Sequence, residues 1–196
     1  EWLYCGLSGL CLAFHFAFWI QSLQLTSVAS ATILVATQPL FTSLLAWLVL
    51  KEPIGRRDIF ALLISFLGVV LIGKGDFQLS KSGIIGDIMA IIAGALAGAY
   101  FLAGRKVRKT VDITNYITVC YSSAALFLGI LAFTVGNSFS GFSGNTFFWM
   151  FILALVPTII GHSLFNWSLK YVSTHKVGMT IFIEPIGAGV LAFLIF

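Results

Sequence analysis

Seven long apolar runs divide this chain, and they restrict its fold more than any other feature of the sequence. Each run has about 18 to 24 residues, close to the roughly 20 that an α-helix needs to cross the hydrocarbon core of a bilayer. The runs lack the strict alternation of barrel strands and are about twice as long as one. Since a backbone in lipid must satisfy its own hydrogen bonds, they predict an all-α, polytopic membrane helix bundle. The seven expected helices cover about residues 2–24, 28–50, 56–73, 83–103, 113–135, 146–169 and 175–196.

The composition excludes a water-soluble domain. The chain is 59% hydrophobic and only 9% charged, whereas a soluble domain carries about a quarter charged residues. The net charge of +4 does not indicate nucleic-acid binding, because every Lys and Arg lies between the apolar runs or at their ends. We therefore expect an integral, multi-pass protein of a bacterial-type inner membrane, in contact with the lipid bilayer and not with nucleic acid.

The basic residues are divided unequally between two sets of loops, and this asymmetry predicts the orientation. Nine fall in one set and two in the other. Because cytoplasmic loops carry an excess of Lys and Arg, the first set is predicted to be cytoplasmic. The first apolar run then leads outward. The predicted cytoplasmic residues are Lys51, Arg56, Arg57, Arg105, Lys106, Arg108, Lys109, Lys170 and Lys176, and those on the other side are Lys74 and Lys81.

The two halves of the chain are weakly similar when Pro39 is aligned with Pro185. The identities fall in two units, each made of a run, a loop and a second run. The run at 28–50 is predicted to lead inward and its counterpart at 175–196 outward. Equivalent segments of opposite direction are typical of inverted-repeat transporters. The matched pairs are Ser22 with Ser168, Leu23 with Leu169, Ser27 with Ser173, and Leu45-Ala46 with Leu191-Ala192.

The repeat also predicts how the chain relates to a longer protein. In the first half a further run follows Leu50, whereas the second half reaches only the equivalent position. The two runs that open the second half have no counterparts in the first. We therefore expect ten helices, five in each repeat, of which this chain holds seven. Residues 1–75 would form the last three helices of the first repeat, and residues 83–196 the first four of the second.

The order of these features resembles a known family. The stretch from residue 22 to residue 73, SLQLTSVASATILVATQPLFTSLLAWLVLKEPIGRRDIFALLISFLGVVLIG, has a mid-run proline, an acidic residue that closes the run and a final glycine-punctuated run. GDIMAIIAGALAGAYFLAGRKVRK and SLKYVSTHKVGMTIFIEPIGAGVLAFLIF repeat parts of this pattern. The pattern resembles the EamA-type transporters of the drug/metabolite transporter superfamily. The resemblance implies a ten-helix secondary transporter, often an exporter of metabolites, amino acids or drugs, which works by alternating access.

Glu184 and Pro185 stand near the middle of the last run, where neither a charge nor a missing backbone donor is expected. A carboxylate inside the membrane is costly and by default marks a functional site that faces a cavity or the bundle interior. The first half has Gln38 and Pro39 at the equivalent positions. Each proline frees a carbonyl one turn earlier, and paired interruptions in two halves point to a binding site. We therefore expect Gln38 and Glu184 to face a substrate cavity at these breaks.

Three roles are open for Glu184. The carboxyl group exchanges protons with a coupled substrate, binds a cationic or amine-bearing substrate, or makes structural hydrogen bonds alone. A small organic molecule is therefore the expected partner, and protons are a candidate coupling ion. A second copy of the chain is a candidate partner in a homodimer.

Polar residues on two other runs are candidates for the same cavity. His15 and Trp19 share one helix face, and His162 and Asn166 share another, because residues four apart project from the same side. Thr180 lies one turn before the glutamate. Each histidine either binds a ligand or relays a proton, or it makes an interhelical hydrogen bond. The proposed cavity residues are His15, Trp19, Gln38, His162, Asn166, Thr180 and Glu184, with Pro39 and Pro185 as the helix breaks.

A line of small residues recurs at a spacing of four in the run at 83–103. Its members are Gly86, Ala90, Gly94 and Gly98. Small residues at this spacing let the backbones of two membrane helices approach closely. We interpret the line as a packing surface and not as a ligand site.

A passive channel or a membrane receptor is the alternative to a transporter, and an intramembrane protease is a weaker one. GLSG at 6–9 and GFSG at 141–144 match the serine motif of rhomboid-type proteases, and GKGD at 73–76 matches a motif of aspartyl intramembrane proteases. Such short patterns arise readily in a chain with 19 glycines. We therefore predict that the protein is not an enzyme. No ligand spacing indicates a metal site, and no cofactor is expected.

The charge asymmetry makes the topology testable. Single cysteines placed in the loops at 51–57, 104–112 and 170–176 should be protected from an impermeant thiol reagent added to whole cells, because these loops are predicted to be cytoplasmic. Cysteines at 136–145 should be labelled. Strong labelling at 104–112 from outside would contradict the predicted orientation.

Overall fold

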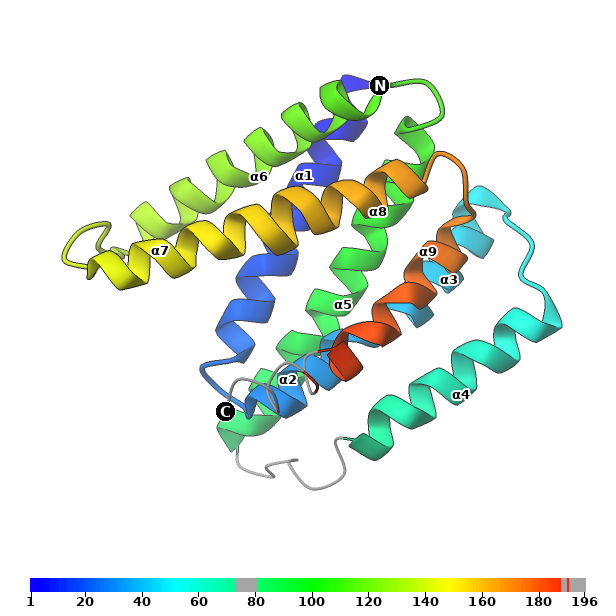
Figure 1. Ribbon diagram of the computed structural model, residues 1–196, viewed down its shortest axis with the longest axis horizontal. Coiled ribbons are helices and arrows are strands. Elements are labelled where there is room, and N and C mark those ends of the chain that lie inside the picture. Colours follow the sequence, from blue (N-terminus) through cyan, green and yellow to red (C-terminus); the bar gives the residue numbers. More distant parts are fainter. Residues whose placement is uncertain (73–80, 188–189, 191–196) are drawn as a thin grey trace.

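The chain folds into a bundle of helices, which confirms the predicted all-α membrane class (Figure 1). The computed structural model describes residues 1–72, 81–187 and 190, and no strand occurs among them. Each of the seven predicted runs is helical over its described part. The elements are α1 (Trp2–Ser22), α2 (Val28–Val35), α3 (Gln38–Leu50), α4 (Arg56–Ile72), α5 (Lys81–Val107), α6 (Ile113–Thr134), α7 (Gly144–Leu153), the π-helix η1 (Ala154–His162), α8 (Ser163–Ser168), α9 (Thr174–Met179) and the 3₁₀-helix η2 (Thr180–Ile183).

Five segments of the described chain are long and apolar enough to cross a membrane, judged by length and composition. They are Trp2–Ser22, Val28–Leu50, Gly83–Val107, Ile113–Thr134 and Gly144–Ser168. The second joins α2 and α3, and the fifth joins α7, η1 and α8. The last predicted run is described only in part, and its repeat partners Leu191-Ala192 lie outside the described residues, as do Lys74 and the GKGD motif.

Short polar residues start three of the helices by capping them. The side chain of Ser27 accepts a hydrogen bond from the backbone N–H of Ser30 (3.0 Å) at the start of α2. Asp112 does the same for α6 and Ser143 for α7. These caps satisfy backbone donors that a helix N-terminus otherwise leaves unpaired.

Three prolines interrupt the long helices. Before Pro39, α2 ends at Val35 and α3 begins at Gln38. Before Pro185, the 3₁₀-helix η2 replaces α-helix. Both breaks were predicted, because proline cannot donate to the carbonyl four residues earlier. The third break was not predicted: Pro157 lies inside the nine-residue π-helix η1.

Helix α5 is the central element and contacts α1, α2 and α3 (Figure 1). Its glycines explain the close fit. A Cβ added to Gly94 would lie 2.9 Å from the carbonyl oxygen of Val35, and one added to Gly98 would lie 3.0 Å from the backbone nitrogen of Thr42. Gly86 approaches the loop after α1 in the same way. The line of small residues is therefore confirmed as a packing surface.

The outer helices lie on opposite sides of this centre. Figure 1 shows α6 and the rod formed by α7, η1 and α8 on the side of α1, whereas α4 stands beyond α3 and α9. Helix α6 packs against α1, and α9 packs against α3. The two broken runs of the chain, α2–α3 and α9–η2, therefore meet directly.

The connections alternate between the two ends of the bundle. The loops at 51–55, 108–112 and 169–173 lie at one end, and those at 23–27 and 135–143 lie at the other (Figure 1). The three basic loops that were expected to share one side are thus together. Their assignment to the cytoplasm stays a prediction.

One predicted loop is shorter than expected. The loop predicted at 104–112 begins only after Val107, because α5 continues through Arg105 and Lys106. Gly104 allows this extension to pack against its neighbours, since a Cβ there would lie 2.9 Å from the hydroxyl oxygen of Tyr116.

Alanine substitutions at two glycines of α1 distinguish the effect of helix packing on stability from the effect of helix propensity. A Cβ on Gly9 would overlap the carbonyl oxygen of Cys120 and lie 2.9 Å from the Cβ of Ser123, whereas a Cβ on Gly6 has nothing closer than 3.9 Å. Gly9→Ala should destabilise the protein by about 1–3 kcal/mol through overpacking. Gly6→Ala should be neutral or slightly stabilising, because alanine favours helix. Thermal unfolding in detergent measures both, and equal effects would contradict the α1–α6 contact.

Candidate functional site

His15 and Trp19 lie together on the face of α1 that packs against α5. The His15 ring nitrogen Nδ1 is 2.9 Å from the carbonyl oxygen of Ala93, and His15 is 7% exposed. Because a carbonyl oxygen can only accept, Nδ1 carries the proton. The Trp19 ring stacks on the imidazole, with centroids 6.2 Å apart and an interplanar angle of 8°. His15 therefore makes the interhelical hydrogen bond that was one of its two predicted roles.

His162 and Asn166 face the same region from the other side. The His162 ring meets the edges of Phe16 and Tyr100, at centroid distances of 5.6 and 5.7 Å. Asn166 is fully buried, and its amide donates to the hydroxyl of Tyr100 and, at 3.4 Å, to that of Tyr121. The predicted pairs His15–Trp19 and His162–Asn166 are thus brought close to one another, through Phe16 and Tyr100.

Three tyrosines complete this cluster, and the sequence analysis did not identify them. The hydroxyl groups of Tyr100 on α5 and Tyr121 on α6 accept hydrogen bonds from the amide of Asn166. The Tyr116 hydroxyl lies 2.6 Å from Ser8 Oγ. The sequence offered one signal for them, a tyrosine in the middle of an apolar run. A buried tyrosine hydroxyl usually needs a hydrogen-bond partner, so such a residue indicates a polar contact inside the bundle.

Gln38 lies across α5 from His15. Its backbone nitrogen is 3.3 Å from the position that a Cβ on Gly94 would occupy, and Gly94 follows the Ala93 that binds His15. Gln38 is 5% exposed. The backbone of α5 therefore separates Gln38 from the aromatic cluster, at the level where Pro39 breaks the neighbouring helix.

Four buried polar atoms of the predicted cavity residues have no hydrogen-bond partner in the described part of the chain. A buried polar atom without a partner costs about 1–3 kcal/mol, so each calls for a water molecule or a ligand. The donors and acceptors are mixed in kind, and none belongs to a charged side chain. They are Trp19 Nε1, Gln38 Nε2, His162 Nδ1 and Asn166 Oδ1.

Thr180 and Glu184 do not join this cluster. Both are exposed, and the Thr180 hydroxyl donates to the carbonyl of Val177 (2.7 Å) on its own helix. Glu184 follows η2 and precedes the half-buried Pro185, and it makes no hydrogen bond or ion pair to the residues that the structure describes. The predicted cavity residues therefore form a buried group and an exposed pair.

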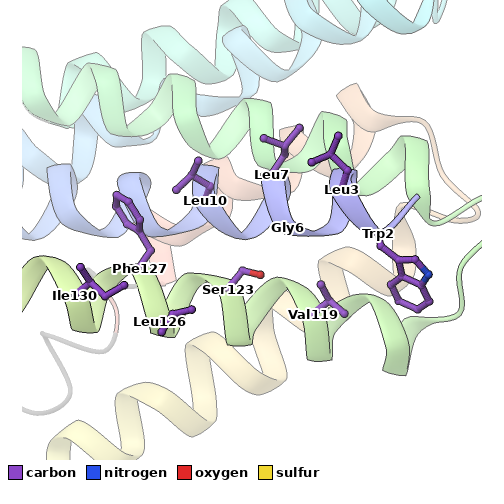
Figure 2. A pocket seen from close by; sticks show the side chains of 10 residues that line it. All are labelled: Trp2, Leu3, Gly6, Leu7, Leu10, Val119, Ser123, Leu126, Phe127 and Ile130. Carbon is purple, nitrogen blue, oxygen red and sulfur yellow. The ribbon is translucent and has the colours of Figure 1, made fainter.

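A hollow formed by other described residues lies elsewhere. It is an open apolar groove of about 500 Å³ between α1 and α6 (Figure 2). None of the predicted cavity residues lines it, so the assignment of a substrate cavity stays a prediction. The lining residues are Trp2, Leu3, Gly6, Leu7, Leu10, Val119, Ser123, Leu126, Phe127 and Ile130.

The protease-like motifs do not form a catalytic pair in the described chain. Ser8 of GLSG donates to the carbonyl oxygen of Tyr100 (3.3 Å) and contacts a tyrosine hydroxyl, not a histidine. Ser143 of GFSG caps α7 by accepting from the N–H of Thr146 (3.2 Å). Nucleophilic catalysis needs a base within hydrogen-bond reach of the serine. Among the described residues, no group of three His, Cys, Asp or Glu side chains is placed to hold a metal ion.

Comparison with known proteins gives a consistent result. The profile of the EamA-like transporter family matches residues 1–74 and 84–196. An uncharacterized transporter of Archaeoglobus fulgidus is 26% identical over 98% of this chain and 68% of its own length. The uncharacterized transporter YdfC of Bacillus subtilis is 25% identical over 86% of this chain and 55% of its own length. The chain thus spans about half to two thirds of these relatives.

Two further matches extend the comparison. Solute carrier family 35 member G1 of Mus musculus is 33% identical over 55% of this chain and 33% of its own length. A solved crystal structure superposes with a TM-score of 0.78, covering 97% of this chain and 67% of the other at 21% identity. That likeness shows a shared fold.

The Asn166 amide makes the buried cluster testable. Asn166→Leu keeps the branched shape, although it is larger, and leaves the Tyr100 hydroxyl without its donor, so we expect a loss of about 1–3 kcal/mol. Ser163→Ala is the matched control on α8, because it removes only the half-buried contact to Tyr121 (3.1 Å) and should cost ~1 kcal/mol or less. Thermal unfolding in detergent compares them. An Asn166→Leu protein as stable as the native one would show that the amide contributes nothing to the fold.

Proposed function

The chain belongs to the EamA-like transporter family, and from that premise we propose that the protein is a secondary transporter, an exporter of small organic molecules that works by alternating access. The family and the names of the relatives indicate a transporter, an integral multi-pass protein with a small-molecule substrate in a lipid bilayer. Bacterial relatives support a location in a cell (inner) membrane of the bacterial type. Substrate, direction and mechanism are the proposal.

The observation that carries the proposal is the set of buried, uncharged polar atoms beside a broken helix. His15 lies near the middle of α1, and Gln38 lies at the break between α2 and α3. Irregular backbone at membrane depth is tolerated where it is packed or lines a cavity. Transporters built from broken helices bind their substrates at such breaks. Unpartnered polar atoms on both sides of α5 supply the hydrogen bonds that a substrate would use.

The chemistry of these atoms indicates the class of substrate. Trp19 and Gln38 offer donors, Asn166 offers an acceptor, and the rings of Phe16 and Tyr100 offer apolar faces. Such a mixture suits amphipathic organic molecules, among them metabolites, amino acids and drugs. Phosphorylated substrates such as nucleotide sugars are disfavoured, because no arginine or lysine lies deep in an apolar run to hold a phosphate group.

The inverted repeat and the homodimer belong to the same proposal. The meeting of α2–α3 with α9–η2 supports the repeat, because each contains a break next to a proline.

The proposal includes no catalytic step: the two serine motifs that the structure describes are engaged in packing and capping. A passive channel differs from a transporter in the concentration dependence of its flux.

Screening of metabolites by thermal shift, followed by flux into liposomes, tests the transporter function. The full-length protein should be stabilised by at least one organic solute, and that solute should cross the membrane with a saturable rate. A flux that rises linearly with concentration would support a channel. Binding without any flux would support a receptor, and either result would overturn the proposal.

Substitution of Glu184 distinguishes the three roles that are open for this residue. If its carboxyl group couples protons, the substitution Glu184→Gln should abolish flux driven by a pH gradient yet keep substrate exchange, because exchange needs no net proton movement. If it pairs with a substrate cation, Gln should weaken binding and Asp should retain part of it. Transport in proteoliposomes with an imposed pH gradient, run beside binding, measures both. Unchanged flux and affinity would remove Glu184 from the mechanism.

A further inference from the structure

Glu52 is held over the end of the bundle by the way α3 terminates. Lys51 adopts a left-handed conformation (φ 55°), and the N–H of Glu52 bonds back to the carbonyl of Ala46 (3.2 Å). A left-handed residue at this position commonly ends a helix and reverses the chain direction. The Glu52 side chain is thereby directed toward the ends of the neighbouring helices.

Both carboxylate oxygens of Glu52 are bound by other elements. Oε1 accepts from the Nε of Arg105 on α5 (2.8 Å), and Oε2 accepts from the backbone N–H of Thr174 at the start of α9 (2.8 Å). Arg105 in turn donates to the carbonyl oxygens of Leu169 (2.6 Å) and Lys170 (3.2 Å), just after α8. One ion pair therefore ties together the ends of α3, α5, α8 and α9.

The ion pair is shielded from water and charged. The side chains of Arg105 and Glu52 are 16% and 12% exposed. Burial alone would raise the pKa of Glu52, but the hydrogen bonds from Arg105 and Thr174 and the positive charge of Arg105 outweigh it and hold the pKa below its ordinary value. The carboxylate is thus ionised at neutral pH. Charge-assisted hydrogen bonds of this kind are stronger than neutral ones.

Beneath this ion pair, α3 and α9 meet through small residues. A Cβ on Gly178 of α9 would lie 3.1 Å from the Cβ of Thr42, and Thr42 also contacts Gly98 of α5. The Thr42 hydroxyl has no hydrogen-bond partner in the described structure. Thr42 is therefore a residue that a separation of α3 from α9 would uncover.

Each of these two helices has a backbone break at its far end. α3 follows the interruption at Ala36 and Thr37, and α9 continues into the 3₁₀-helix η2. Breaks of this kind are where helices bend. Thus α3 and α9 are short rigid arms, each tied to Glu52 at one end and free to bend at the other. His175 Nε2, 3.3 Å from Asp58 Oδ2, couples the start of α4 to the α9 arm, without the alignment of a hydrogen bond.

The opposite end of the described bundle is tied differently. There Thr26 donates to Asp87 (2.7 Å), which joins the loop after α1 to α5 and leaves α3 and α9 unlinked. Among the described residues, the Glu52–Arg105 ion pair and the His175–Asp58 contact both lie at the basic end.

From this asymmetry we infer that Glu52, Arg105 and the N-terminus of α9 form the latch of a gate, which holds the basic end of the bundle closed in this structure and releases the α3 and α9 arms when it breaks. The inference rests on the proposed transporter function. In the open state the arms bend at the two breaks, Thr42 becomes accessible from the basic end, and the α1–α2–α5 packing at the other end is kept.

Cysteine accessibility tests the latch without any knowledge of the substrate. In a full-length protein whose Cys5, Cys11 and Cys120 are alanine, a reporter is introduced by Thr42→Cys. An impermeant thiol reagent is added to open membrane fragments, in which both faces are accessible. Glu52→Gln should raise the labelling rate of this reporter by about tenfold or more, because the rate follows the population of the open state, which the substitution raises. Arg105→Lys, which keeps the charge but not the planar fork, should raise it less.

Two controls separate a gate from general loosening. A second reporter, made by Ala31→Cys in the fully buried part of α2, should not change its rate with Glu52→Gln. Asp112→Ala removes a helix cap at the same end without touching the latch, and it should leave the Thr42→Cys reporter protected. An unchanged rate in Glu52→Gln and Arg105→Lys, an equal rise at both reporters, or an equal effect of Asp112→Ala would each overturn the inference.

The labelling result is independent of the flux assay. A protein that transports none of the screened solutes can still open at this end, and that outcome would count against the proposed function alone. If the protein transports a solute but the labelling rate of the Thr42→Cys reporter does not change with Glu52→Gln, the proposed function stands and the inferred latch is wrong.

Discussion

The backbone contact between α5 and its neighbours is the constraint on which the other features depend. Gly94 and Gly98 bring the α5 backbone against the start of α3, and Gly9 brings α1 against α6. A Cβ at Gly9 or Gly94 would clash with a neighbouring backbone, and one at Gly98 would require its neighbours to shift. In a bilayer, where lipid tails are as apolar as leucine, such close contact is a main source of helix association. The positions of His15 and Gln38 on either side of α5 follow from it.

The same contact explains how the chain accommodates a proline in the middle of a membrane helix. Pro39 cannot donate to the Val35 carbonyl, and that oxygen lies directly against Gly94. The freed carbonyl therefore faces the backbone of α5. The glycine and the proline therefore act together, although they are 55 positions apart in the sequence. Polar groups deep in the bundle are uncharged or histidine, and the ion pairs lie at its basic end.

Much of the fold was predictable, because membrane burial imposes simple rules on the sequence. Run length predicted the helices, charge placed the basic loops together, and Pro39 and Pro185 marked two breaks. The π-helix at Pro157 was not predicted, since a proline alone does not specify whether a helix kinks, ends or widens. The sequence also could not show that Asn166 would meet tyrosines of two other helices, or that Glu184 would lie apart from them, because both depend on how distant segments pack.

The π-helix η1 has a consequence for how length changes can be tolerated along this chain. A π-turn holds about one more residue than an α-turn, so η1 absorbs an additional residue between α7 and α8. No residue of α7 is buried, whereas α8 carries the buried Asn166. Loss of one residue within Ala154–His162 would convert a π-turn into an α-turn, which leaves α7 and α8 close to their present rotation relative to each other. The extra residue of η1 is therefore one that the chain can lose while the buried Asn166 of α8 keeps its position.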